Sequence, residues 1–474
     1  MPSITPIATE EVASQPKESS RDYKNYTSPL IVVTLLFFMW GFITCMNDIL
    51  IPKLQEVFTL QLWQAMLIQT AFFGAYFIVS FLYFLLSVSK GDPIQKIGYK
   101  NGIIIGLIVA ALGCTLFYPA AVFHSYGFFL MALFVLASGI TVLQITANPY
   151  VAILGSPETS SSRMNLSQAL NSFGTTIAPI IGGYLIFDQV ASAEIDTADS
   201  VKLPYLGLAA LLLLLAVLIK VAKLPRLEGG GKIERGAGAT KYPHLVLGIV
   251  CIFMYVGGEV SIGSALINYI KLPQITGLSE SEAKHYLAFY WGGAMIGRFF
   301  GAVALSTFKR TGKFAVIALI ALVTFLTVYV LYDLNQALII LGLIALNVVV
   351  LLLARFIPNR TVGLFAMAVI GLLLIGVMAE GSLAMWAIIA IGLFNSIMFP
   401  TIFDLAIKGL GRHTSQGSSL LVMAIVGGAI VPPLQGLFAD LSGDLQLSFI
   451  IPMLCYAYIV YYGFVGYKVK EARV

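Results

Sequence analysis

Long apolar stretches recur along almost the whole chain, and they constrain its fold more than any other feature. Fourteen such stretches of about 20 residues can be marked off between residues 29 and 467, and about 20 residues is the helix length that crosses the hydrocarbon layer of a bilayer. Lipid offers no partner to an unpaired backbone amide, and the alternating pattern of barrel strands is missing. The sequence therefore predicts an all-α integral membrane protein with about fourteen spanning helices.

The composition excludes several other classes of protein. Only 11% of the 474 residues are charged and 59% are hydrophobic, whereas soluble domains carry about 25% charged residues. The net charge of +5 is spread over short loops, which argues against a nucleic-acid partner. The four histidines are isolated and no catalytic or metal-binding motif occurs in the sequence, so we expect no enzyme and no organic cofactor.

The basic residues predict how the chain is oriented. Of the 28 Lys and Arg, Arg298 falls within a span and only Lys53, Lys202, Lys271 and Lys284 fall on the outer side if the N-terminus is cytoplasmic. Basic loops stay on the cytoplasmic side of a membrane. We expect both termini to be cytoplasmic, residues 1–28 to form a polar tail, and the membrane to be a bacterial inner membrane.

A weak internal repeat divides the chain into two. Gly174, Pro179 and Gly183 match Gly427, Pro432 and Gly436 at a constant offset of 253 residues, as in transporters built from parallel repeats. This predicts an N-terminal six-helix half over residues 29–222, a Gly-rich cytoplasmic linker over 223–243, and a C-terminal half over 244–474. The second half is longer by about 35 residues, enough for one extra helical hairpin.

Few ionisable side chains lie deep inside the expected spans: Asp48, Glu259, Arg298 and Asp404. Charges at this depth are costly, so each should face a cavity or a partner. We consider the three acids candidates for coupling transport to a cation. The alternative is a structural interhelical pair, such as Arg298 with an acid.

Uncharged polar residues concentrate in the fourth and fifth spans. Gln144 and Asn148 are four residues apart and Gln168 and Asn171 are three apart, so each pair shares a helix face. Amides donate and accept hydrogen bonds at once, which suits the hydroxyls of a sugar. The alternative is ordinary hydrogen bonding between helices. Further candidate sugar contacts are Asn47, Glu259, Tyr290 and Asn395.

Several strings resemble the fucose permease and glucose/galactose porter branch of the major facilitator superfamily. In the first half these are Phe37 to Gly41 with Asn47 to Leu50, Thr146 to Tyr150, and Asn165 to Gly174; in the second half they are Tyr255 to Glu259, Gly297-Arg298, Pro400 to Phe403, and Gly417 to Ser419 followed by Gly427-Gly428. The likeness covers nearly the whole chain. It implies two six-helix halves that alternate access to a site between them.

The resemblance also assigns roles and shows departures. Asp48 falls on the first-helix acid implicated in proton coupling, whereas the family's second coupling carboxylate falls on Gln144, which cannot take up a proton. Asp404 stands where the fucose permease has an uncharged residue. The Arg355 to Arg360 loop resembles the loop after the family's eighth helix, which places the extra hairpin at about residues 308–354. We expect that hairpin to pack on the periphery, away from the sugar path.

The sequence thus predicts a monomeric symporter that imports a neutral hexose such as glucose, galactose or mannose. The absent second acid slightly favours sodium over a proton, with Asp48 as a possible sodium ligand among amide and carbonyl oxygens. A proton-coupled fucose-type symporter, and a uniporter or sensor without coupling, remain the alternatives.

Overall fold

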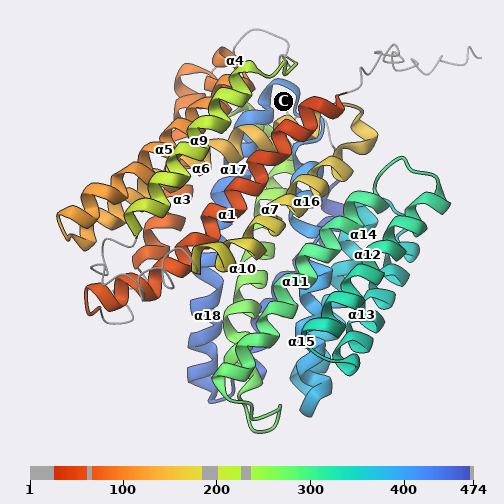
Figure 1. Ribbon diagram of the computed structural model, residues 1–474. Helices are drawn as coiled ribbons and strands as arrows, with labels where there is room; N and C mark the ends of the chain where they lie inside the picture. Colours follow the sequence, from red (N-terminus) through yellow and green to blue (C-terminus); the bar gives the residue numbers. More distant parts are fainter. Residues whose placement is uncertain (1–25, 61–66, 184–200, 226–235, 470–474) are drawn as a thin grey trace, which may run out of the picture.

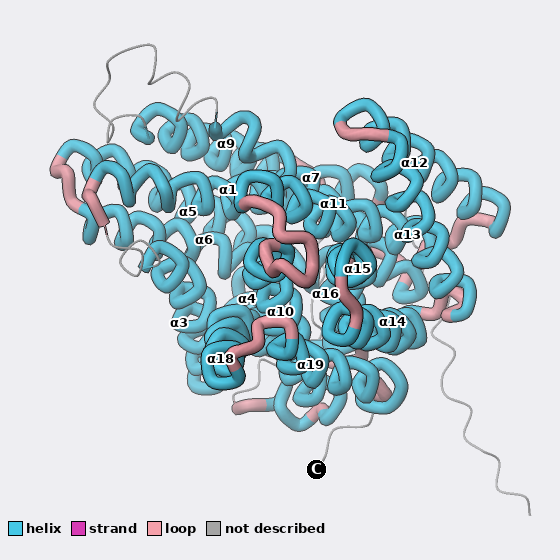
Figure 2. The backbone as a smooth tube through the Cα atoms, turned by 90° about the horizontal axis from the view of Figure 1, so that it is seen from below, coloured by secondary structure: helices cyan, strands magenta, loops and turns pink. Residues whose placement is uncertain are grey.

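The computed structural model describes residues 26–60, 67–183, 201–225 and 236–469, and every regular element in these ranges is helical (Figures 1 and 2). Most of the expected N-terminal tail and much of the linker lie outside the described residues. The N-terminal group of helices comprises α1 (Thr27–Val57), α3 (Leu67–Lys90), α4 (Pro93–Ile97), α5 (Tyr99–Val122), α6 (Tyr126–Ile153), η1 (Pro157–Thr159), α7 (Ser160–Gly183) and α9 (Lys202–Val221).

The C-terminal group follows the linker. It comprises η4 (Gly238–Lys241), α10 (Pro243–Ile270), α11 (Glu280–Ala304), α12 (Arg310–Leu331), α13 (Leu334–Leu353), α14 (Pro358–Met378), α15 (Gly381–Asn395), α16 (Met398–Ile407), η5 (Gly411–His413), α17 (Thr414–Met423), η6 (Ala424–Val426), α18 (Gly427–Ser442), η7 (Leu447–Phe449), α19 (Ile450–Tyr461) and η8 (Tyr462–Gly466).

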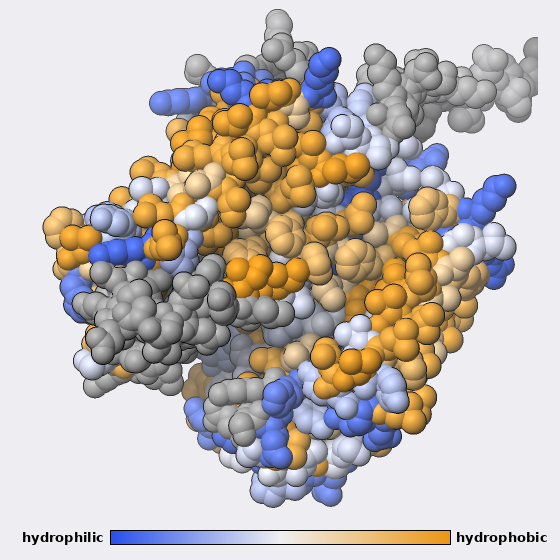
Figure 3. Space-filling view, viewed as in Figure 1, coloured by the Kyte–Doolittle hydropathy of each residue, from blue (hydrophilic) through white to orange (hydrophobic). Residues whose placement is uncertain are grey.

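The number of spanning helices agrees with the sequence. Thirteen helical segments of the described chain are long and apolar enough to cross a membrane. The remaining expected span corresponds to α7, which has 24 residues but carries a polar first half. Figure 3 shows apolar side chains over much of the visible face, with hydrophilic residues at its upper and lower ends. This distribution suits a protein surrounded by lipid.

Within each group, one glycine lets two helices cross closely, and the two glycines occupy corresponding positions. A Cβ added at Gly174 of α7 would lie closer than 3.0 Å to the carbonyl oxygen of Phe38 in α1, and one added at Gly427 of α18 would collide with the carbonyl of Phe253 in α10. These are the residues related by the offset of 253. Only glycine permits such close helix crossings, so the sequence repeat has a structural counterpart.

Helices α12 and α13 pack on the edge of the C-terminal group (Figure 1). In the described part of the chain, their main contacts are to each other and to α11, α14 and α15. Only 11% of the most apolar window of α12 and 22% of that of α13 are buried, against 83% for the segment Gly381–Ile407. The pair therefore stands between the bundle and the surrounding lipid.

Several hydrogen bonds join the two groups at one end of the molecule, which we call the α4 end. This end carries α4 (Figure 1) and η5, whose Arg412 contacts Gln95 of α4. Here Ser415 donates to the Tyr99 hydroxyl at 3.2 Å and the Gln416 amide donates to Ser87 Oγ at 2.9 Å. Gln95 also donates to the carbonyl of Arg412. From this end the helices of the two groups diverge, and Figure 3 shows the surface recessed between them.

Candidate functional site

Three buried amides of α6 and α7 carry polar atoms without a partner among the described residues. Gln144, Asn148 and Gln168 are at most 4% exposed. Within the described residues, Gln144 Oε1, Gln168 Nε2 and both polar atoms of Asn148 find no hydrogen-bond partner. A buried polar atom without a partner costs about 1–3 kcal/mol. Helices α6 and α7 pack against each other, so these donors and acceptors come from adjoining elements and could meet a hydroxylated ligand.

Asn171 differs from the other three amides. Its Nδ2 donates to the carbonyl of Phe37 at 3.0 Å and so ties α7 to α1. Asn165, a turn and a half earlier, donates to the carbonyl of Ser161 and to Thr401 Oγ1 of the C-terminal group. Asn165 and Asn171 of α7 thus form hydrogen bonds between and within helices, which is the alternative to sugar binding that the sequence left open.

The C-terminal group contains a polar network with the opposite character. Tyr255 Oη lies 2.7 Å from Glu259 Oε1, and Tyr290 donates to the backbone carbonyl of Glu259 at 3.0 Å. Asn395 Nδ2 donates to Tyr290 Oη at 3.0 Å, and Asn395 Oδ1 accepts from Tyr456 at 2.6 Å. Three of the predicted sugar contacts, Glu259, Tyr290 and Asn395, are therefore brought together, and Tyr255 and Tyr456 supply further hydrogen bonds to Glu259 and Asn395.

A broken helix shapes this network. The stretch predicted as one span is divided into α15 and α16 at Ser396 and Ile397. Pro400 has no N–H, so the carbonyl of Ser396 lacks its usual helical donor, and Arg298 Nε takes that place at 3.1 Å. The carbonyl of Asn395 lies 3.0 Å from Tyr255 Oη. Interrupted helices at membrane depth need such partners.

Arg298 also connects the two groups. Its Nη1 donates to Ser172 Oγ of α7 across the interface. Among the described residues, the hydrogen-bond partners of this side chain are thus a hydroxyl and a backbone carbonyl. The interhelical ion pair considered from sequence is not among them in the described part of the chain.

Asp404 lies in the contact between the two groups toward the α4 end. The hydroxyls of Ser160 and Ser161, at the start of α7, each donate to one of its carboxylate oxygens. Ser162 donates to the carbonyl of Ala302 at 2.5 Å. The structure therefore separates Asp404 from the Glu259 network and gives it hydroxyl donors from the opposite group.

Asn47 and Asp48 fall within α1, but their side chains lie outside the described part of the structure. Their predicted roles stay predictions. In the ranges that are described, no three His, Cys, Asp or Glu side chains gather as a metal site.

Sequence reasoning missed several partners. Tyr255 precedes Glu259 by four residues and so shares its helix face, a spacing that could have identified it. The serine run before Arg163 was a visible polar cluster at the start of a span, but nothing in it points to Asp404. Tyr456 is one of 22 tyrosines, and only tertiary packing singles it out.

The chain is similar to known proteins along nearly its whole length. Residues 30–354 match the Major Facilitator Superfamily. The chain is 46% identical over 472 residues to the glucose/galactose transporter of Brucella abortus biovar 1 (strain 9-941), covering 99% of both chains. It is 32% identical to the L-fucose-proton symporter of Escherichia coli (strain K12), covering 96% of both.

Solved structures show the same relationship. A crystal structure of a major facilitator superfamily transporter, FucP, in the outward conformation is similar with a TM-score of 0.73 and 32% identity, over 92% of this chain and 98% of that one. The proton:xylose symporter XylE bound to 6-bromo-6-deoxy-D-glucose has a TM-score of 0.64 at 12% identity, covering 94% and 97%. The latter likeness concerns the fold alone.

Proposed function

Because this chain belongs to the major facilitator superfamily, whose members are transporters and not enzymes, we propose that it imports a neutral hexose of the glucose or galactose type by symport with a cation. The observation that carries this proposal is the set of buried amides on α6 and α7. Gln144, Asn148 and Gln168 offer donors and acceptors that find no partner among the described residues. Sugar hydroxyls supply both complements, and a relative at 46% identity is named a glucose/galactose transporter.

The second wall of the site comes from the C-terminal group. Glu259, Tyr290 and Asn395 form one hydrogen-bonded unit, and Arg298 joins that group to α7 through Ser172. A sugar between the groups would form new hydrogen bonds mainly on the N-terminal side and contact a preformed surface on the other. This arrangement fits alternating access around a site at the interface of two repeats.

We propose a proton as the coupling ion. The sequence alone slightly favours sodium, because Gln144 replaces a second acid. Glu259, however, is a second deeply placed carboxylate, 9% exposed, so that Asp48 and Glu259 together could carry and relay a proton. A relative at 32% identity is named a proton symporter. Asp404, with two serine donors across the interface, is better suited to holding the groups together.

The α4 end is the cytoplasmic end in this proposal, because α4 and η5 carry Lys96 and Arg412 and basic residues favour the cytoplasmic side of a membrane. The groups are joined there by hydrogen bonds such as those of Gln416 and Ser415. The described conformation would then be closed to the cytoplasm and face outward. Similarity to FucP in the outward conformation supports this assignment.

Uptake of labelled hexoses into proteoliposomes tests the function. Imposed proton and sodium gradients are compared for the wild type, Asp48→Asn, Glu259→Gln and the control Glu380→Gln, whose side chain is exposed beyond the span. We expect a proton gradient to drive accumulation, both deep substitutions to abolish it while retaining sugar counterflow, and the control to behave as wild type. Accumulation driven by sodium alone would overturn the coupling ion, and absence of any hexose flux would overturn the function.

A further inference from the structure

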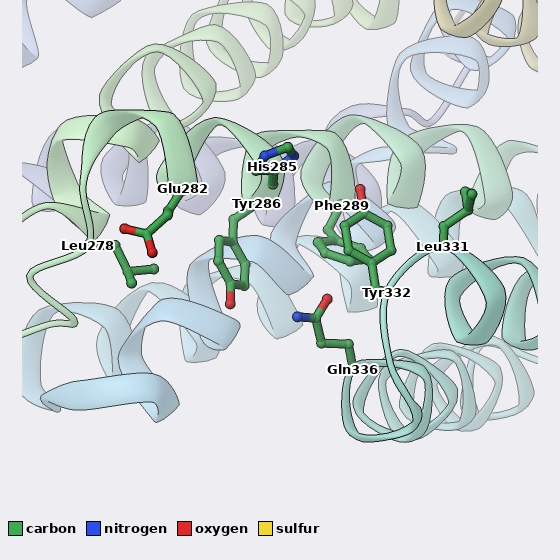
Figure 4. A pocket seen from close by; sticks show the side chains of 8 residues that line it. All are labelled: Leu278, Glu282, His285, Tyr286, Phe289, Leu331, Tyr332 and Gln336. Atoms are coloured by element: carbon green, nitrogen blue, oxygen red, sulfur yellow. The ribbon is translucent and has the colours of Figure 1, made fainter.

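A pocket of about 520 Å³ lies at the end of the molecule opposite α4, and its lining shares no residue with the amides or the Glu259 network. Helix α11 forms one wall and the α12–α13 hairpin forms the other (Figure 4). This volume falls in the range of small-molecule sites. The lining residues are Leu278, Glu282, His285, Tyr286, Phe289, Leu331, Tyr332 and Gln336.

Aromatic rings give the pocket a fixed apolar wall. The rings of Phe289 and Tyr332 lie 4.8 Å apart between centroids and so connect α11 with the turn of the hairpin. Trp386 of α15 stands behind them, 5.6 Å from Phe289 and 5.8 Å from Tyr286. Each ring is thus held by another, and flat rings of this kind offer a stacking face to a ligand.

Gln336 supplies a hydrogen-bond acceptor whose partner is missing among the described residues. Its side-chain Oε1 is buried and receives no hydrogen bond. Its backbone N–H donates to Asp333 Oδ1 at 2.8 Å, which fixes this residue in the first turn of α13. Figure 4 shows its amide pointing from α13 toward the space beneath Tyr286 and Phe289. Leaving such an acceptor unpaired is unfavourable, so it points to a ligand with a donor.

Glu282 supplies a charged group at the rim of the pocket. Its Oε2 accepts from the Ser279 N–H at 3.0 Å and from the Ser279 hydroxyl at 2.6 Å. These hydrogen bonds lower the pKa of the Glu282 carboxyl, so the group is ionised at neutral pH. The other carboxylate oxygen remains available to a donor.

From this lining we propose that the pocket binds a neutral polyhydroxylated small molecule, a monosaccharide, at a site separate from the transport path. Stacking rings, a carboxylate, an amide and the imidazole of His285 together match a sugar's apolar face and its hydroxyls. The lining residues that the structure describes include a carboxylate and no Lys or Arg, which disfavours phosphate groups. An organic ammonium ion would use Glu282 and the rings but would not require the Gln336 amide.

The fluorescence of Trp386 can report whether a sugar binds in the pocket. The full-length protein in lipid nanodiscs is titrated with glucose, galactose and mannose while tryptophan fluorescence is recorded, and Trp386→Phe identifies the part of the signal that reports the pocket. We expect a saturable change that Trp386→Phe removes. Losing the acceptor in Gln336→Leu should raise the dissociation constant by about tenfold, the size expected for one hydrogen bond to a ligand.

Matched controls come from the same hairpin. Tyr332→Ala is compared with Tyr329→Ala, whose ring is 50% exposed outside the pocket, and Gln336→Leu with Asn335→Leu, whose side chain is exposed. The pocket variants should weaken binding, the controls should not, and all four should fold and keep hexose uptake. A Trp386 signal that survives in Asn148→Ala would further separate the pocket from the transport site.

Two outcomes would overturn the proposal: no sugar signal from Trp386 in any titration, or saturable binding of choline with none of the sugars. This pocket does not depend on the proposed transport function. Failure of hexose uptake with an intact Trp386 signal would reject the transport proposal alone, and normal uptake without the signal would reject the pocket alone.

Discussion

Asn148 and Gln168 of the N-terminal group and Asn395 of the C-terminal group are all buried, but the polar atoms of their amides are paired in opposite ways. On α6 and α7, Asn148 and Gln168 present atoms that no described residue pairs with. In the C-terminal group, Asn395 uses both ends of its amide, toward Tyr290 and Tyr456. The difference teaches that an amide's role depends on whether its neighbours satisfy it: unpaired amides are available to a ligand, and paired amides stabilise the fold.

Among variants that test this difference, Asn395→Leu should have the largest effect on stability. It removes the acceptor of the Tyr456 hydroxyl and the donor to Tyr290, and leaving the buried Tyr456 hydroxyl without this acceptor costs about 1–3 kcal/mol. We expect a melting temperature several degrees lower in thermal unfolding experiments, whereas Asn335→Leu on the exposed hairpin should change little. An unchanged melting temperature would contradict the structural role of this network.

Asn148→Ala should weaken sugar binding without lowering the melting temperature, the reverse of Asn395→Leu. We expect the dissociation constant for sugar to rise by about 10- to 100-fold, since a ligand loses an amide worth about 1–3 kcal/mol. The melting temperature without sugar should stay the same or rise, because two unpaired buried atoms disappear. Equilibrium binding and thermal unfolding measure the two quantities. A destabilised variant with normal affinity would place Asn148 with the structural amides.

Removing the donors to Asp404 tests the contact between the groups. In the double variant Ser160→Ala/Ser161→Ala the carboxylate loses both hydroxyl donors. We expect this loss to shift the equilibrium between the closed and the open α4 end by about 1–2 kcal/mol toward the open state. A cysteine placed at the buried Ser415, in a background without the native thiols, should then be labelled about 5- to 30-fold faster. Ser89→Ala, whose hydroxyl bonds within its own helix, is the control. Labelling at the wild-type rate would show that these serines do not hold the end closed.

Tyr456→Phe should give the smallest effect. It removes one hydrogen bond to Asn395, and the loss is about 1 kcal/mol. Thermal unfolding should show a shift well below that of Asn395→Leu, with unchanged sugar affinity. Tyr461→Phe, on the same helix and 45% exposed, should be neutral. A large loss of affinity in Tyr456→Phe would mean that the network contacts the sugar directly.

The fold could be predicted from the sequence because the bilayer imposes one simple rule. Apolar length and polar punctuation located the spans, including α7 despite its polar first half. The rule fails where one span is interrupted, as at Ser396, because Pro400 shows only that a carbonyl lacks a donor. It does not show that Arg298, about a hundred residues earlier, will provide one.

The candidate site was predictable by type of residue but not by partner. Glu259, Gln144 and Asp404 stand out because polar groups are rare in lipid-spanning segments. Their environments are set by helix packing, which one sequence does not encode locally. Glu259 and Asp404 look alike in sequence, yet one receives a tyrosine from its own helix and the other two serines from the opposite group.

The glycine crossings have a mechanical consequence. At Gly174 and Gly427 backbone meets backbone, so α7 cannot slide or roll far along α1, nor α18 along α10, without collision. Each pair is a rigid part, and the freedom to move is left to the surface between the groups, where side chains hold them by hydrogen bonds. Shape therefore determines what moves as one piece, while serines and Asp404 determine how readily it moves.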